Sequence, residues 1–82
     1  DTVSSLRLDA VCSTGLRMAR GKAAELIESG RVQLNWRECT KPDKPVAAGD
    51  TVSARGYGKF SLAEVGGLTN KGRIPITVKC YQ

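Results

Sequence analysis

Apolar residues near the start of the chain recur at the spacing of an α-helix. Leu8, Val11 and Cys12 fall on one helical face. The serines that precede this face are typical capping residues, and Gly15 is a typical helix stop. We therefore predict a first, short helix within residues 4–15.

A second helical pattern lies in the stretch ARGKAAELIESG. Ala19, Ala23, Leu26 and Ile27 share one face, and Gly30 ends the run. Small residues on this face allow a close approach to the first helix. The sequence thus predicts two helices packed against each other.

The charges of the second helix oppose its dipole. Arg20 and Lys22 stand near the partly positive N-terminus, whereas Glu25 and Glu28 lie toward the partly negative C-terminus. A bound anion would offset the repulsion at the N-terminus, where free backbone N–H groups also point outward. This order of charges favours a phosphate site, with ordinary solvated side chains as the alternative.

After Gly30 the apolar period changes to two, as in half-buried strands. Val32 and Leu34 alternate with polar residues, and later stretches repeat this pattern. We predict strands around RVQLN, TVSAR, KFSLAEVGG and GRIPITVKCY, separated by a KPDKP loop, a GYG bend and an LTNKG turn. The fold class is therefore α+β, with two packed helices followed by a small, mainly antiparallel sheet.

The last predicted strand combines alternating apolar residues with a proline. We expect its inward side chains to be Ile74, Ile76, Val78 and Cys80. Because proline has no N–H to donate to a ladder, Pro75 indicates that this strand lies at an edge of the sheet.

Composition argues against several kinds of chemistry. The 82 residues fit one small domain, and a net charge of +5 favours an acidic partner such as RNA. The chain has no histidine and no C-x-x-C pair, so metal sites, cofactors and histidine-based catalysis are not expected. No apolar run approaches the ~20 residues that cross a bilayer. We predict a monomeric domain without enzymatic activity, metal, cofactor or membrane contact.

Four sequence features occur in the order of a known RNA-binding domain. They are RLD in the first helix, the basic stretch before AAELI in the second, the GRV that follows, and the GD before TVSAR. Residues 6 to about 60 thereby resemble the RNA-binding domain first described in ribosomal protein S-four. The resemblance implies an α-L RNA-binding motif, with a C-terminal β extension over residues 60–82.

The extension is similar to the tail of a narrower family, the photosystem II S-four-domain proteins and their bacterial cell-division-locus relatives. Members of that family carry another domain before this one and are linked to ribosome-associated quality control. The resemblance implies that residues 1–82 are a single RNA-binding domain at the C-terminal end of a longer protein. It implies structured RNA as the partner, ribosomal RNA or tRNA on the ribosome, in a bacterial cytoplasm or a plastid stroma.

The resemblance also implies which residues contact RNA: Arg7, Arg20, Lys22, Arg31 and Asn35. Arg17 lies in the loop that enters the second helix and Arg37 follows the first predicted strand, so both add charge to this set. Secondary contacts are expected from Lys41, Arg55, Lys71 and Arg73, with ordinary surface charge as the alternative. Asp9 is the expected carboxylate partner that holds a basic residue of the second helix in position.

Alternatives stay open for two aromatic residues and for the function. Trp36 replaces the glycine of the usual Asn-Gly turn, and we expect its ring to cover the core, with stacking on a base as the alternative. Tyr57 fits a stacking platform as well as an anchor for the bend. One rival function is a protein-interaction module that docks through the edge strand around Pro75. Another is the RNA-targeting domain of an RNA-modifying enzyme such as a pseudouridine synthase.

Overall fold

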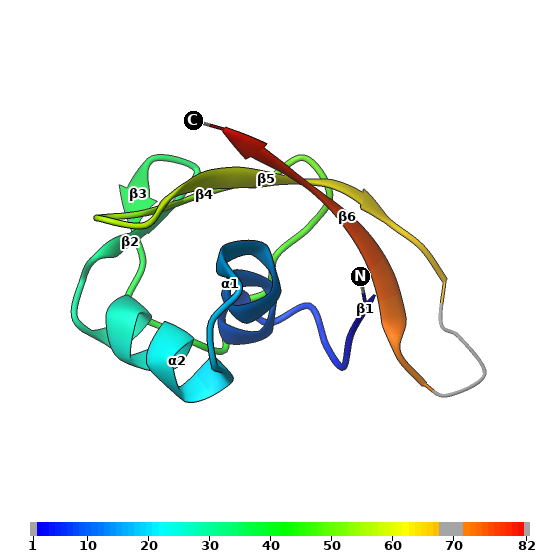
Figure 1. Cartoon of the computed structure of the whole chain (residues 1–82), viewed down its shortest axis with the longest axis horizontal. Helices are drawn as coiled ribbons and strands as arrows, with labels where there is room; N and C mark the ends of the chain where they lie inside the picture. Colours follow the sequence, from blue (N-terminus) through cyan, green and yellow to red (C-terminus); the bar gives the residue numbers. More distant parts are fainter. Residues whose placement is uncertain (1, 68–71, 82) are drawn as a thin grey trace.

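Two helices cover one face of an antiparallel sheet (Figure 1). The computed structural model describes residues 2–67 and 72–81. The helices are α1 (Leu8–Leu16) and α2 (Arg20–Glu28). The strands are β1 (Thr2–Val3), β2 (Val32–Leu34), β3 (Arg37–Glu38), β4 (Thr51–Ala54), β5 (Gly58–Val65) and β6 (Ile74–Tyr81). Within the described residues their spatial order is β1-β6-β5-β4-β2-β3, and neighbouring strands are antiparallel, which confirms the predicted α+β class.

The core lies between the helices and the inner face of the sheet. Leu34, Val52 and Phe60 are aligned across three neighbouring strands, and all three are buried. The period of two therefore gives each strand one buried face. The helices contribute the apolar residues that their 3.6-residue period predicted: Leu8, Val11, Cys12, Ala23, Leu26 and Ile27. There are two exceptions: Ala19 precedes α2 as its N-cap residue and is exposed, and Ala24, which was also expected in the core, is half-buried.

The expected serine cap of the first helix is wrong. The N-cap residue is Arg7, whose side chain makes no capping hydrogen bond. Instead, the backbone N–H groups of Leu8 and Asp9 donate to the carbonyl oxygens of Lys44 and Pro42, each at 2.9 Å. The 41–45 loop thus supplies acceptors for the free N–H groups at the start of α1.

The expected stop at Gly15 is also wrong, because this glycine lies inside α1. A Cβ atom at Gly15 would come within 2.6 Å of the Phe60 ring, so the helix can approach β5 closely only without a side chain here. The helix ends at Leu16 and is capped by Arg17, whose φ of 55° is left-handed and whose N–H donates to the carbonyl oxygen of Ser13. The requirement for glycine at position 15 therefore comes from Phe60, which is far away in the sequence.

The last strand is not a free edge at Pro75. β1 pairs with β6 there, with Thr2 opposite Pro75 and Val3 opposite Ile74. The Arg73 guanidinium secures this pairing, since it donates to the hydroxyl of Thr2 at 2.9 Å and to its carbonyl oxygen at 3.0 Å. The edge strand that the protein-docking alternative required is therefore covered at this point.

The inward face of β6 is less buried than predicted. Ile76 is buried, and Ile74 and Val78 are half-buried, but Cys80 is exposed. Cys80 lies opposite Phe60 and borders a hollow whose lining includes Gly15 and Gly58. The thiol of Cys80 is therefore open to this hollow rather than buried in the core.

The predicted GYG bend is a tight turn between β4 and β5. Gly56 and Gly58 have φ values of 84° and 110°, which glycine adopts without strain. Tyr57 between them is about half exposed, at 49%. Most of the predicted LTNKG turn, residues 68–71, lies outside the described residues.

Candidate nucleic-acid interface

A buried carboxylate connects the starts of the two helices. The Asp9 side chain is 7% exposed and accepts hydrogen bonds from Arg7 Nη2 at 2.9 Å and Arg7 Nε at 3.2 Å. Arg20 Nη2 also contacts it at 3.4 Å, and the Ala10 backbone N–H donates to it at 2.8 Å. The predicted pairing of Asp9 with a basic residue of the second helix is confirmed.

The two arginines remain half in solvent while Asp9 holds them. Their side chains are 46% exposed for Arg7 and 44% exposed for Arg20. A second contact, from Arg20 Nη1 to the Ser4 hydroxyl at 3.3 Å, helps to fix the Arg20 guanidinium. Their orientation is thus set from the protein side, while other N–H groups face solvent.

The N-terminus of α2 is positively charged. Arg20 is its first residue, Lys22 follows in the first turn and is exposed, and no acidic residue occupies that turn. The N-cap residue Ala19 makes no side-chain hydrogen bond to the free N–H groups. The placement predicted for these two cations at the helix start is therefore confirmed, and the N–H groups are left for solvent or a ligand.

The 41–45 loop brings further cations to this end of the helices. Besides the two carbonyl contacts to the start of α1, Arg7 pairs with Pro45 in an isolated β-bridge. A hollow of about 570 Å³ lies beside the loop. Its lining residues are Leu34, Asn35, Arg37, Glu38, Cys39, Thr40, Lys41 and Lys44.

These contacts connect the elements that carry five basic residues, a set that we call the cationic rim: Arg7, Arg20, Arg37, Lys41 and Lys44. Asp9 joins the first two, a β-bridge places Arg7 beside Pro45, the chain neighbour of Lys44, and Lys44, Lys41 and Arg37 line the same hollow. The site prediction omitted Lys44. The KPDKP stretch indicated a loop that carries Lys44. The sequence pattern does not reveal that this loop folds back onto the first helix, and so the site prediction missed it.

The turn between β2 and β3 borders the same hollow. Asn35 and Trp36 have φ values of 52° and 65°, so both adopt the left-handed conformation that an Asn-Gly turn would use. Asn35 anchors the turn, because Thr51 N–H donates to its Oδ1 at 2.9 Å and its Nδ2 donates to Asp50 at 3.0 Å. Trp36 is 68% exposed, so the expectation that it covers the core is wrong.

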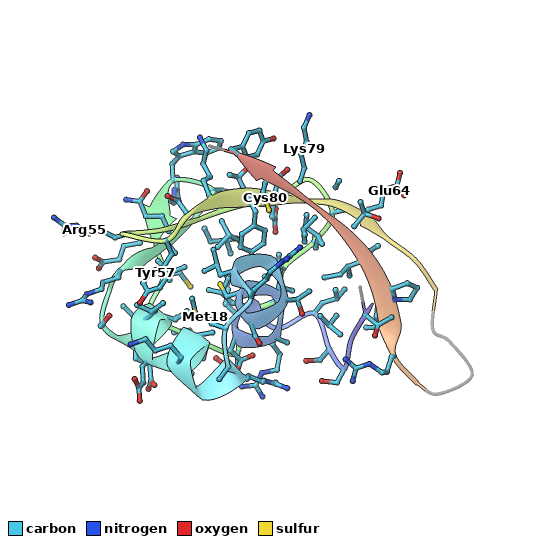
Figure 2. The ribbon with its side chains drawn as sticks, in the orientation of Figure 1. Met18, Arg55, Tyr57, Glu64, Lys79 and Cys80 are labelled. Carbon is cyan, nitrogen blue, oxygen red and sulfur yellow. The ribbon has the colours of Figure 1, made fainter. Side chains whose placement is uncertain are left out.

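Other predicted cations lie away from the cationic rim. Arg31 and Arg55 border a separate hollow that also contains Glu38, and Arg55 projects outward from the β4–β5 turn (Figure 2). Arg17 ends α1 and borders the hollow near Tyr57. Arg73 holds β1 in place, as described above, and Lys71 lies outside the described residues. The structure thus divides the candidates into several surfaces rather than one.

The buried thiol of α1 has a perturbed pKa. Burial, and then the nearby negative charge of Asp9, raise the pKa of Cys12 to about 12 from 9.0. The described residues hold no group of three or more His, Cys, Asp or Glu side chains that could bind a metal. None of the helices in that part of the chain has the length and apolar character to span a membrane.

Comparison with known proteins supports the resemblance seen in the sequence. A model of the S4 domain family matches residues 6–52, more than half of the chain. The chain is also 46% identical over 77 residues to "Ribosome-associated protein quality control protein P2" of Bacillus subtilis (strain 168). That match covers 94% of this chain and 30% of the relative, so the chain corresponds to less than a third of the relative's length.

Proposed function

Because this chain belongs to the S4 domain family, we propose that it is a non-catalytic module that binds structured RNA through the cationic rim. The observation that carries the proposal is the arrangement around Asp9. A buried carboxylate holds two half-exposed guanidinium groups at the adjoining starts of two helices. Arginine is well suited to this task, because its planar donors match phosphate oxygens and it carries its charge at every physiological pH.

Recognition in this proposal depends on phosphate position and overall shape. The orientation of Arg7 and Arg20 is fixed by Asp9, and the free N–H groups of α2 add an uncharged phosphate-binding element. Lys41 and Lys44 add charge on the loop side. In paired RNA the base edges of the deep groove are out of reach, while phosphates and 2′-hydroxyl groups are accessible. A rigid set of donors suits these accessible groups.

The finer proposal is that ribosomal RNA or tRNA on the ribosome is the ligand. It is supported by the name of the Bacillus subtilis relative, which describes a ribosome-associated protein, and by the net charge of +5. We propose a bacterial cytoplasm or a plastid stroma as its location, because these are the compartments that the family resemblance implies.

Salt dependence and a pair of charge-removing variants test the proposal. We expect the affinity of the chain for a ribosomal RNA hairpin and for tRNA to fall steeply with salt, because bound phosphates release counterions. Replacing Arg37 and Lys44 with glutamine should weaken binding and reduce the slope of log affinity against log salt by about one for each lost phosphate contact.

The matched control is Lys79→Gln, which removes a single positive charge from β6. The Lys79 side chain points away from the helices (Figure 2), and it lies outside the cationic rim. Its loss should therefore change RNA affinity little. Equal losses for Lys79→Gln and for each rim variant would show that only net charge matters, and an affinity that ignores salt would exclude phosphate binding.

A further inference from the structure

Trp36 combines two features that are unfavourable in a folded domain. Its side chain is 68% exposed, more than that of any other large apolar residue in the described part of the chain. Its φ of 65° places a bulky L-residue in the left-handed region, where glycine is the favoured residue. Backbone strain of this kind persists where surrounding structure enforces it and is often found at functional sites.

The surrounding structure does enforce the Trp36 conformation. Asn35, the preceding residue, donates its backbone N–H to the Thr51 carbonyl oxygen at 2.7 Å. The Asn35 side chain accepts a hydrogen bond from Thr51 N–H and donates one to Asp50. On the other side of the turn, Arg37 pairs with Leu34. The indole is therefore held on an anchored turn.

The charges next to Trp36 select a nucleic acid over an apolar partner. The hollow beside the turn is bordered by Asn35 and Arg37, the two neighbours of Trp36, and by Lys41 and Lys44. Glu38 is the one acidic residue among the lining residues in the described structure. An exposed indole offers a π-face on which any base can stack, and the three cations can bind the phosphates next to that base.

We propose that Trp36 stacks on an unpaired base of RNA bound at the cationic rim. The inference rests on the proposed function and narrows its ligand to structured RNA that carries an unpaired nucleotide, in a loop or a bulge, beside a helical segment. Paired RNA would occupy the arginines around Asp9, while the unpaired base would lie against the indole. The strained tryptophan then has a role that a glycine at the same position could not fill.

The experiment uses the single tryptophan of the chain as its own probe. Two RNA hairpins closed by the same non-nucleotide linker are titrated into the protein. One carries a two-base bulge and the other is fully paired with one additional base pair, so that both have the same number of nucleotides and the same charge. Stacking on Trp36 should quench its fluorescence with the bulged RNA and much less with the paired RNA. Trp36→Phe should keep most of the preference for the bulged RNA, because it retains an aromatic face.

Trp36→Gly gives the decisive result because its two expected effects have opposite signs. Glycine adopts positive φ without strain, so the melting temperature should stay the same or rise. Loss of stacking should reduce affinity for the bulged RNA by roughly 5- to 150-fold, while affinity for the paired RNA changes little. The matched control is Tyr57→Ala, which removes an exposed aromatic ring from the turn at the other end of β4 and should leave the preference unchanged.

Three results would overturn the inference. A lower melting temperature for Trp36→Gly with unchanged RNA affinity would make Trp36 structural. Unchanged stability and unchanged affinity for both RNAs would exclude stacking of the indole on RNA and would favour a protein partner for it. Equal losses of affinity for the two RNAs would show that Trp36 does not recognise the unpaired base. If the unaltered chain bound neither RNA, the proposed function itself would fail, which is a distinguishable outcome.

Discussion

The two helices have the same length and different roles. α1 and α2 each span nine residues, and neither has a side-chain cap at its N-terminus. α1 buries five consecutive residues, from Leu8 to Cys12, including the charged Asp9. α2 buries three, Ala23, Leu26 and Ile27, and presents its cations to solvent. We infer that α1 mainly determines stability, and that α2 mainly presents the ligand surface.

One glycine in each helix shows the difference most directly. A Cβ at Gly15 of α1 would collide with the ring of Phe60, whereas a Cβ at Gly21 of α2 would meet no atom within 4 Å. Glycine in a helix interior normally lowers stability, because the unfolded chain has more conformational freedom. In α1 this loss is offset by close packing, while in α2 nothing in the described structure offsets it.

The largest expected difference concerns thiol reactivity. Because burial and the Asp9 charge raise the pKa of Cys12 to about 12 from 9.0, its thiolate fraction near pH 8 should be about 1,000-fold lower than that of an ordinary thiol. We expect a thiol reagent to label exposed Cys80 rapidly and Cys12 only through unfolding. Mass spectrometry of the labelled peptides measures this. Rapid labelling of Cys12 in the native protein would contradict the burial of α1.

The same shift sets the sign of a pH effect on stability. The folded protein favours the protonated thiol, so the contribution of Cys12 is fully present below pH 9 and is lost as the pH rises toward about 12. The free energy of unfolding should therefore decrease over this range. Cys12→Ala should remove this part of the pH dependence, although it lowers stability by creating a cavity.

Gly15→Ala should produce the next largest effect. The added methyl group would have to displace the Phe60 ring, which is fully buried, so we expect a loss of about 1–3 kcal/mol in the free energy of unfolding. Urea-induced unfolding followed by circular dichroism measures it. The matched control, Gly21→Ala, should instead gain about 0.5–1 kcal/mol. A gain for both variants would contradict the close approach of α1 to β5.

The case of Gly15 shows which parts of the fold the sequence could predict. Local periodicity predicted the buried faces of both helices and the alternation around Val32, since each depends on neighbours in the chain. The sequence pattern indicated a helix stop at Gly15. Glycine is required there because of a contact with Phe60, which lies 45 positions further along the chain, so a local pattern could not reveal it. The pairing of Thr2 with Pro75 was missed for the same reason, since no local pattern links the two ends of the chain.

The candidate site divides in the same way. The pairing of Asp9 with Arg20 could be predicted, because both lie in helices already expected to pack. The role of Lys44 could not, because it requires the 41–45 loop to fold back onto α1. Trp36 was expected to cover the core with its apolar ring, but it is exposed on a turn that Asn35 anchors to Asp50 and Thr51. Local hydrogen bonding prevailed over side-chain hydrophobicity at that position.

Asp9→Asn tests whether the α1 carboxylate organises the cationic rim. Asparagine keeps the shape but removes the charge that holds Arg7 and Arg20, so we expect a loss of about 1–3 kcal/mol in the free energy of unfolding. RNA affinity should also fall, although the net positive charge increases. The control is Glu25→Gln on the exposed side of α2, which should leave stability nearly unchanged and slightly raise RNA affinity. Stronger RNA binding by Asp9→Asn would show that Asp9 only opposes the ligand.

The smallest expected effects separate the two cations at the start of α2. Both oppose the helix dipole, so sequence reasoning alone predicts that removing them leaves stability unchanged or raises it. The contact of Arg20 with Asp9 changes this expectation for one of the two. Arg20→Gln should lose about 0.2–1 kcal/mol, the usual value for a half-exposed ion pair. Lys22→Gln should gain a few tenths of a kcal/mol, since its side chain is exposed and only the unfavourable dipole interaction is removed.

Thermal unfolding at low salt compares the stabilities of the two variants, and 0.5 M salt should reduce both changes because screening weakens both interactions. Opposite signs would confirm that Arg20 is a structural partner of Asp9 and that Lys22 is not, and equal gains for both variants would remove Asp9 as the organiser of the cationic rim.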